Sequence, residues 1–148
     1  MLERLKRLFA GEASPTEREA HDLPTAVAAL MIEVMMQDGR LDAEEERVIH
    51  HLLGKRFSLD DAAIRDLVAR ARARADHAHD LFQFTARIIR GYPVAERADV
   101  IRELWRVAMA DGRADAYEEQ LIRRIAELIG VEHRAFIEAK IQARGESA

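Results

Sequence analysis

An internal repeat constrains the fold of this chain more than any other feature of its sequence. The segment 38–46, with the sequence DGRLDAEEE, returns about 73 residues later as the segment 111–119, with the sequence DGRADAYEE. When residues 34–49 are aligned with residues 107–122, roughly ten of the sixteen positions are identical, and both apolar and acidic positions are among them. Because the apolar frame repeats together with the acids, the two segments are expected to form the same helix–turn–helix.

Nearly every other segment carries apolar residues at helical spacing, and none shows the sustained alternation of a strand. This pattern predicts an all-α, single-domain bundle of about seven to eight helices with an internal pseudo-duplicated helix–turn–helix. Residues 14–17 (SPTE) resemble a capping box with proline at the first helical position. The other helices are expected at about 24–37, at 42–56, after a Ser58 cap, from 76–80 to Gly91, at about 94–110, at 115–129 and after Gly130.

The domain organisation follows from the short linkers. Residues 13–148 are expected to form the helical domain, whose halves, about 24–75 and 93–145, should pack on each other around one core. Residues 1–12 form an amphipathic arm with Leu2, Leu5, Leu8 and Phe9 on one stripe. Such a short helix is marginal alone in water, so we expect it to dock on its own domain or on a dimer partner. Contact of residues 1–10 with a membrane surface is the alternative.

Composition excludes several functional classes. The chain has 148 residues, no cysteine and a formal net charge of −4. The absence of cysteine excludes thiolate catalysis and Cys-based zinc or iron–sulfur sites, and the mildly acidic balance argues against binding of nucleic acid. No apolar run approaches the ~20 residues of a membrane span, and residues 1–9 lack the features of a signal peptide, so a cytoplasmic location is expected.

The repeated acids are the candidate functional residues. Each repeat places one aspartate at a helix end, a second at the next helix start and two glutamates one turn further in. They are Asp38, Asp42, Glu45 and Glu46 in the first repeat and Asp111, Asp115, Glu118 and Glu119 in the second. Oxygen ligands of this kind suit a divalent cation such as Ca²⁺, Mg²⁺ or Mn²⁺, and two corners related by a pseudo-dyad could together complete its coordination.

Helix capping is the competing interpretation of the same residues. An aspartate at the N-cap with a glutamate three residues later satisfies free N–H groups of the first turn without any metal. An EF-hand is excluded, because its first and third ligand positions would fall on Val34 and Met36, or on Val107 and Met109. Both capping alone and capping combined with cation binding stay open on the sequence.

The repeats also resemble the TerB-like family, a helical domain associated with tellurite resistance that is similar to the N-terminal domain of a membrane-anchored J-domain co-chaperone. The resemblance extends from about Pro24 to Lys140. Its matching pieces are residues 29–39 (ALMIEVMMQDG) with Asp42, Glu45 and Glu46, and residues 104–112 (LWRVAMADG) with Asp115, Glu118, Glu119 and residues 121–126 (LIRRIA).

This resemblance implies a stress-response or interaction module with no established enzymatic activity. It also implies that Asp38, Asp42, Glu45, Asp111, Asp115 and Glu118 form a metal-related cluster. The chain departs from the family in having Gln37 where alanine is common, and the sequence shows no J-domain or membrane anchor.

No catalytic or cofactor-binding residue is predicted, because the nucleophile-elbow, P-loop, dinucleotide-binding and zinc-protease motifs are all missing. The histidines do not form a ligand set, and Trp105 lies on an apolar stripe that predicts a core position. The expected function is therefore a cytoplasmic binding or scaffold module that engages a protein partner or forms a homodimer. A metal-dependent enzyme that uses the carboxylate cluster is the alternative.

Overall fold

The computed structural model describes residues 15–36, 41–77 and 81–147, and every regular element within them is helical. The elements are α2 (Pro15–Met35), α3 (Ala43–Phe57), α4 (Asp61–His77), α5 (Phe82–Gly91), α6 (Val94–Ala108), α7 (Ala116–Leu128) and α8 (His133–Ser147). Since these ranges contain seven helices and no strand, the predicted all-α fold is confirmed. The expected N-terminal arm and Asp38 lie outside the described residues.

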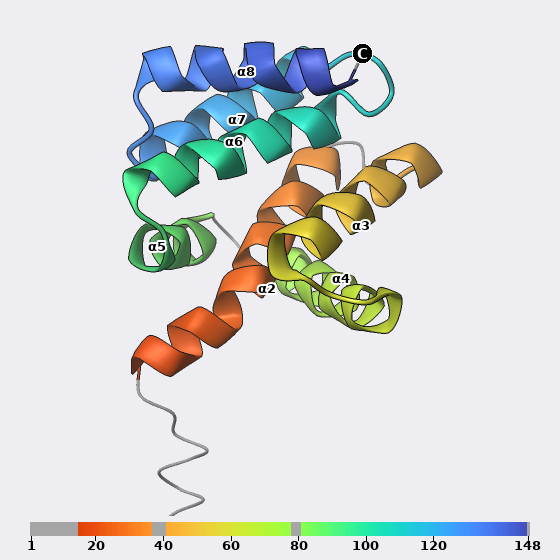
Figure 1. Cartoon of the computed structure of the whole chain (residues 1–148), viewed down its shortest axis with the longest axis vertical. Coiled ribbons are helices and arrows are strands. Elements are labelled where there is room, and N and C mark those ends of the chain that lie inside the picture. Colours follow the sequence, from red (N-terminus) through yellow and green to blue (C-terminus); the bar gives the residue numbers. More distant parts are fainter. Residues whose placement is uncertain (1–14, 37–40, 78–80, 148) are drawn as a thin grey trace, which may run out of the picture.

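Two central helices, α2 and α6, organise the bundle (Figure 1). The helix α2 packs against α3 and α4, and α6 packs against α7 and α8 in the same manner. Contacts also cross between the halves: α2 packs on α6, α2 touches α7, and α6 touches α3. The connecting helix α5 packs on α2, α6 and α7. The helix contacts of the first half therefore recur in the second half.

The C-terminal part of α2 is buried around its whole circumference. Every residue from Ala26 to Ile32 is at most 1% exposed, because α2 is in contact with α3, α4, α5, α6 and α7. A helix that is apolar on all sides is stable only inside a core. In the second half Trp105 is fully buried and its ring lies 5.3 Å from that of Phe136, which confirms the predicted core position of the tryptophan.

Pro24 lies inside α2, so the prediction of a helix start at this residue is wrong. The helix begins at Pro15, where proline is tolerated because the first N–H groups of a helix have no intrahelical partner. An internal proline costs about 3 kcal/mol, whereas burial of one large apolar side chain contributes about 1.5–3 kcal/mol. The run of buried residues that follows Pro24 outweighs its cost and carries the helix through.

The sequence suggested Ser58 as the N-cap of α4. In the structure the N-cap is Asp60. The Asp60 carboxylate accepts a hydrogen bond from the Ala63 N–H at 2.8 Å. Ser58 instead ends α3 in the left-handed region, with φ 53°, and its N–H donates to the carbonyl of Gly54. Similarly, α5 begins at Phe82, later than expected, because α4 continues to His77. Both residue types can cap a helix, so the length of the preceding helix decided which one does.

The Arg97 guanidinium donates hydrogen bonds to backbone carbonyl groups at the C-terminal ends of α5 and α7. Its Nη2 donates to the carbonyl of Ile89 in α5 at 3.1 Å, its Nε to that of Tyr92 at 2.7 Å and its Nη1 to that of Ile129 after α7 at 3.1 Å. The last carbonyl groups of a helix have no intrahelical partner and carry partial negative charge. A guanidinium therefore stabilises this junction by both hydrogen bonding and charge.

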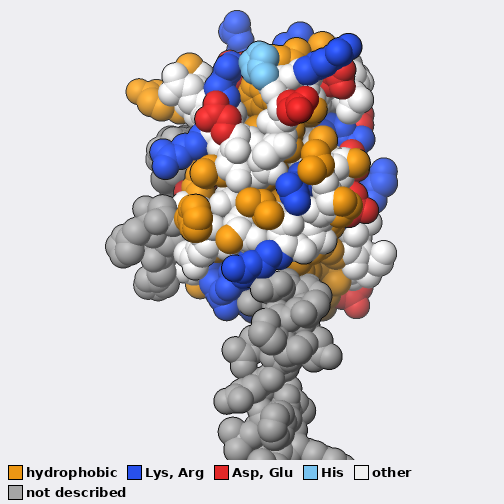
Figure 2. Space-filling view, turned by 90° about the vertical axis from the view of Figure 1, so that its left-hand side faces the viewer, with side chains coloured by type: hydrophobic (Ala, Val, Ile, Leu, Met, Phe, Trp, Pro, Cys, Tyr) orange, Lys and Arg blue, Asp and Glu red, His pale blue; other side chains and the backbone are white. Residues whose placement is uncertain are grey.

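The surface around α5 exposes apolar side chains. Phe82 is 68% exposed, and Ile89 and Val94 are also exposed. Figure 2 shows the side of the molecule on which α5 lies, and hydrophobic side chains are interspersed there with Lys and Arg side chains. No helix in the described ranges is long and apolar enough to cross a membrane.

Candidate functional site

The two acidic corners lie on the same side of the bundle, where α2 and α6 end and α3 and α7 begin (Figure 1). Asp42 precedes α3 with φ −79° and ψ 168°, and Asp115 precedes α7 with φ −81° and ψ 173°. Their backbone conformations thus match closely and are typical of an N-cap. The capping role predicted for both aspartates is confirmed.

The second corner forms a complete capping box. The Glu118 N–H donates to Asp115 Oδ1 at 2.8 Å, and the Asp115 N–H donates to Glu118 Oε1 at 2.8 Å. Upstream, Asp111 Oδ1 accepts a hydrogen bond from the Arg113 N–H at 3.3 Å, across Gly112, whose φ of 105° favours glycine. Glu118 is only 9% exposed, an unusual degree of burial for a glutamate.

In the first corner the pKa of the Glu45 carboxyl group is shifted from its ordinary value. The Glu45 N–H donates to Asp42 Oδ1 at 2.8 Å, and this backbone hydrogen bond lowers the pKa of Asp42. Burial, together with the hydrogen bond and the charge of Asp42, raises the pKa of Glu45 to about 8. The charge of Glu118 adds to this rise. The N3 glutamates of the two repeats are therefore electrostatically coupled, although burial and Asp42 have the larger effects on Glu45.

The outer glutamates have partners within their own halves. Glu46 Oε1 lies 3.7 Å from His50 Nε2 on α3, and Glu119 Oε1 lies 2.8 Å from Lys140 Nζ on α8. These two glutamates were predicted to join the cluster, and in the structure each one faces a basic or titratable neighbour. Asp38, the remaining candidate, lies outside the described residues.

The described residues of the acidic corners do not by themselves form a complete set of metal ligands. Within the described ranges, no three His, Asp or Glu side chains are grouped closely enough to hold a metal ion. The helix N-termini carry partial positive charge, which stabilises the capping carboxylates and opposes a cation. In contrast, burial and the neighbouring Asp42 carboxylate, with a smaller contribution from Glu118, favour a protonated Glu45, and a bound cation would compensate the same negative charge. Glu45, Glu118 and Asp42 are the described residues best placed to hold such a cation.

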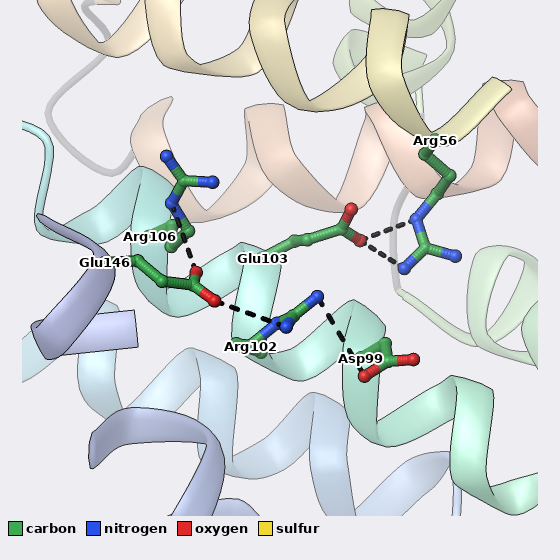
Figure 3. Close-up of polar contacts among 6 residues, drawn as sticks. All are labelled: Arg56, Asp99, Arg102, Glu103, Arg106 and Glu146. Atoms are coloured by element: carbon green, nitrogen blue, oxygen red, sulfur yellow. Dashed lines mark hydrogen bonds and ion pairs between the residues drawn. The ribbon is translucent and has the colours of Figure 1, made fainter. Parts of the chain in front are cut away.

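Sequence reasoning missed a buried ion pair between the halves (Figure 3). Arg56, near the end of α3, donates from Nε to Glu103 Oε2 on α6 at 2.6 Å, and both side chains are largely buried. The guanidinium also lies 5.2 Å from the centre of the Tyr92 ring. The repeat itself contains a signal for this pair, because Glu103 aligns with the fully buried Leu30 of the first half.

A second set of contacts in Figure 3 joins α6 to α8. Arg102 Nη1 lies 3.3 Å from Glu146 Oε1, and Arg106 Nε lies 3.5 Å from Glu146 Oε2. These side chains are partly exposed, so the contacts orient α8 but contribute little stability.

Comparison with known proteins gives one informative result. A family model described as tellurite resistance protein TerB matches residues 24–141, which is most of the chain. Comparison with curated proteins and with solved structures gave no match. The matched range contains both acidic corners.

Proposed function

The chain belongs to the TerB family of tellurite resistance proteins, and on this premise we propose that it is a cytoplasmic binding module whose paired acidic corners bind a divalent cation. Asp42, Glu45, Asp115 and Glu118 contribute to the site directly, together with Asp111, and the repeat in the sequence adds Asp38. Glu46 and Glu119 support it from the outer side. The bound ion links the two halves, and the module then presents its surface to a partner in a stress or metal response.

One observation carries the cation proposal. The pKa of Glu45 rises to about 8, mainly because the carboxyl group is partly buried beside Asp42, and the charge of Glu118 from the other repeat adds to the rise. Helix capping explains why each glutamate follows its aspartate, but capping does not require the charge of one corner to act on the glutamate of the other. A divalent cation at this place would compensate the burial of the Glu45 carboxylate and its repulsion by Asp42 and, to a smaller degree, by Glu118, and it would replace the proton on Glu45.

The partner proposal rests on the apolar surface at α5. Phe82, Ile89 and Val94 are exposed, although large apolar side chains usually lie in the core. We propose that this surface engages a protein partner or a second copy of the chain. The test is Phe82→Ser combined with Ile89→Ser, which should weaken self-association or partner binding in sizing experiments and leave the melting temperature nearly unchanged.

The cation proposal is tested by substitutions that keep hydrogen bonding and remove charge. Asp42→Ser and Asp115→Ser retain an N-cap acceptor, and Glu45→Gln and Glu118→Gln retain the N3 group. The wild type should gain thermal stability with Ca²⁺, Mg²⁺ or Mn²⁺ by mass action, about 2.7 kcal/mol at an ion concentration 100 times the Kd. The quadruple variant should lose that gain.

The chain offers a matched control for this experiment. Asp60 caps α4 with the same 2.8 Å hydrogen bond and lies outside the acidic corners, so Asp60→Ser should leave the ion response intact. If capping is the only role of the corners, the quadruple variant should lose at most about 1–2 kcal/mol, with or without ions. A wild-type midpoint that none of the three ions moves, together with no calorimetric binding, would refute the cation proposal.

A further inference from the structure

A cavity beside the second acidic corner has the character of an anion site. It encloses about 490 Å³ between the end of α6, the turn that precedes α7, the start of α7 and α8. Its walls include Trp105, Met109, Arg113, Glu119, Lys140 and Arg144. Cavities that hold small organic ligands typically enclose about 300–1,000 Å³.

The charges in the cavity wall are unbalanced. Three basic side chains line the cavity and one carboxylate opposes them. The carboxylate, Glu119, is already engaged by Lys140 Nζ at 2.8 Å. Arg113 and Arg144 form no side-chain ion pair within the described parts of the chain. Two guanidinium groups therefore line a concave surface without a compensating anion, and guanidinium is well suited to bind carboxylate or phosphate.

Trp105 provides an independent observation on the same wall. Its side chain is fully buried, and its indole Nε1 has no hydrogen-bond partner in the described part of the chain. Buried polar groups in native proteins are almost always paired, so the indole N–H of this cavity-lining residue lacks an acceptor. Lys140 Nζ lies 5.0 Å from the centre of the indole ring, which brings this positive charge close to the same wall.

We propose that this cavity binds a small organic anion through a carboxylate or phosphate group. Arg113 and Arg144 bind the charged group, the indole N–H of Trp105 donates a further hydrogen bond, and the apolar part of the ligand packs on Met109. The enclosed volume is larger than an inorganic ion needs, and this favours an organic molecule. The proposal can be tested separately from cation binding, because the side chains of Arg113, Arg144 and Trp105 are not among the proposed cation ligands; only the backbone N–H of Arg113 contacts an acidic corner, at Asp111.

The tryptophan also provides a direct measurement. The chain contains one tryptophan, so a ¹⁵N–¹H correlation spectrum contains one indole N–H resonance, and that resonance belongs to the cavity wall. Succinate, AMP and inorganic phosphate are added separately, with sodium chloride at equal ionic strength as the reference. We expect a saturable shift of the indole resonance with succinate or AMP and a weaker response to inorganic phosphate. The comparison of succinate with AMP distinguishes a carboxylate ligand from a phosphate ligand.

Substitutions then assign the effect to the cavity. Arg113→Gln combined with Arg144→Gln should weaken binding of the responsive probe about tenfold or more, because two charge-assisted hydrogen bonds are lost. Arg134→Gln, which removes one positive charge from an exposed position on α8 outside the cavity, is the control for each single substitution and should leave the affinity unchanged. Both variants act on exposed residues, so folding is preserved. The proposal is overturned if neither organic probe shifts the resonance beyond sodium chloride, or if Arg134→Gln weakens binding as much as the cavity variant.

Discussion

The guanidinium of Arg56 on α3 and the carboxylate of Glu103 on α6 form a largely buried ion pair, with Nε 2.6 Å from Oε2, that joins the two halves of the bundle. Burial raises the pKa of Glu103, and Arg56 opposes that rise through its hydrogen bond and its charge. Because arginine stays protonated at any accessible pH, Glu103 is the partner whose protonation would break the pair.

We predict that the two residues of this pair are strongly coupled in stability. Glu103→Leu alone should lower the free energy of unfolding by about 3–5 kcal/mol, because it leaves the Arg56 charge buried without a partner. The double variant Arg56→Leu/Glu103→Leu should recover most of that loss, since an apolar pair of similar volume is often neutral or stabilising. Denaturant unfolding of the wild type, both single variants and the double variant measures the coupling. Losses that simply add would contradict this account.

Glu45 makes stability depend on pH in the neutral range. Its pKa is about 8 in the folded chain against an ordinary 4.5, so the folded state binds more protons between these values. The contribution of Glu45 to stability is therefore full below pH 4.5 and is lost as the pH rises through about 8. The lowered pKa of Asp42 acts in the opposite direction, but only near and below its ordinary value of 3.8.

The corresponding experiment compares melting temperatures at pH 5, 7 and 9, because this range spans most of the window between the ordinary pKa of Glu45, 4.5, and its folded value of about 8. Glu45→Gln resembles the protonated carboxyl group, so the variant should lose less stability than the wild type between pH 5 and pH 9. The control is Glu44→Gln, which changes an exposed neighbour that pairs with Arg47 at 3.0 Å. Parallel curves for the wild type and Glu45→Gln would show that Glu45 does not titrate in this range.

Cation affinity should rise with pH if the acidic corners bind an ion. A carboxylate must lose its proton before it can coordinate metal, and Glu45 retains its proton up to about pH 8. Each unit of pH below 8 should therefore weaken binding by up to about tenfold. Calorimetric titration with Mn²⁺ and Ca²⁺ at pH 6.5 and 8.5 measures the change. In Glu45→Gln the pH dependence should disappear along with most of the affinity.

The N-terminal segment should affect association more than folding. Its apolar stripe of Leu2, Leu5 and Leu8 predicts a docking helix, and the family match begins only at residue 24. Removal of residues 1–11 should leave the helical circular dichroism signal and the melting temperature of the bundle nearly unchanged, while it weakens self-association measured by light scattering. Leu5→Asp combined with Leu8→Asp in the full chain should have the same effect, because the apolar stripe is the proposed cause. Unchanged association in both variants would contradict the docking role.

Local sequence was sufficient for most of the secondary structure and for half of the candidate site. Helical periodicity predicted the all-α fold and the burial of Trp105, because a 3.6-residue period directly specifies which face of a helix is buried. The repeated Asp-x-x-Glu pattern predicted the caps at Asp42 and Asp115, because capping involves atoms only three residues apart. Predictions were less accurate at Pro24 and Ser58, where tertiary burial and the length of the preceding helix decided the outcome.

Only the tertiary structure decided which charges meet across the bundle. The sequence marked Glu103 as unusual, since it takes the place of the buried Leu30, but its partner Arg56 lies 47 residues away and reaches it only because α3 packs on α6. In the same way, the sequence supplied Glu45 and Glu118 as two separate caps, and packing made them one interacting pair. Local rules act over a few residues, whereas long-range electrostatics depends on the distances and the burial that helix packing imposes.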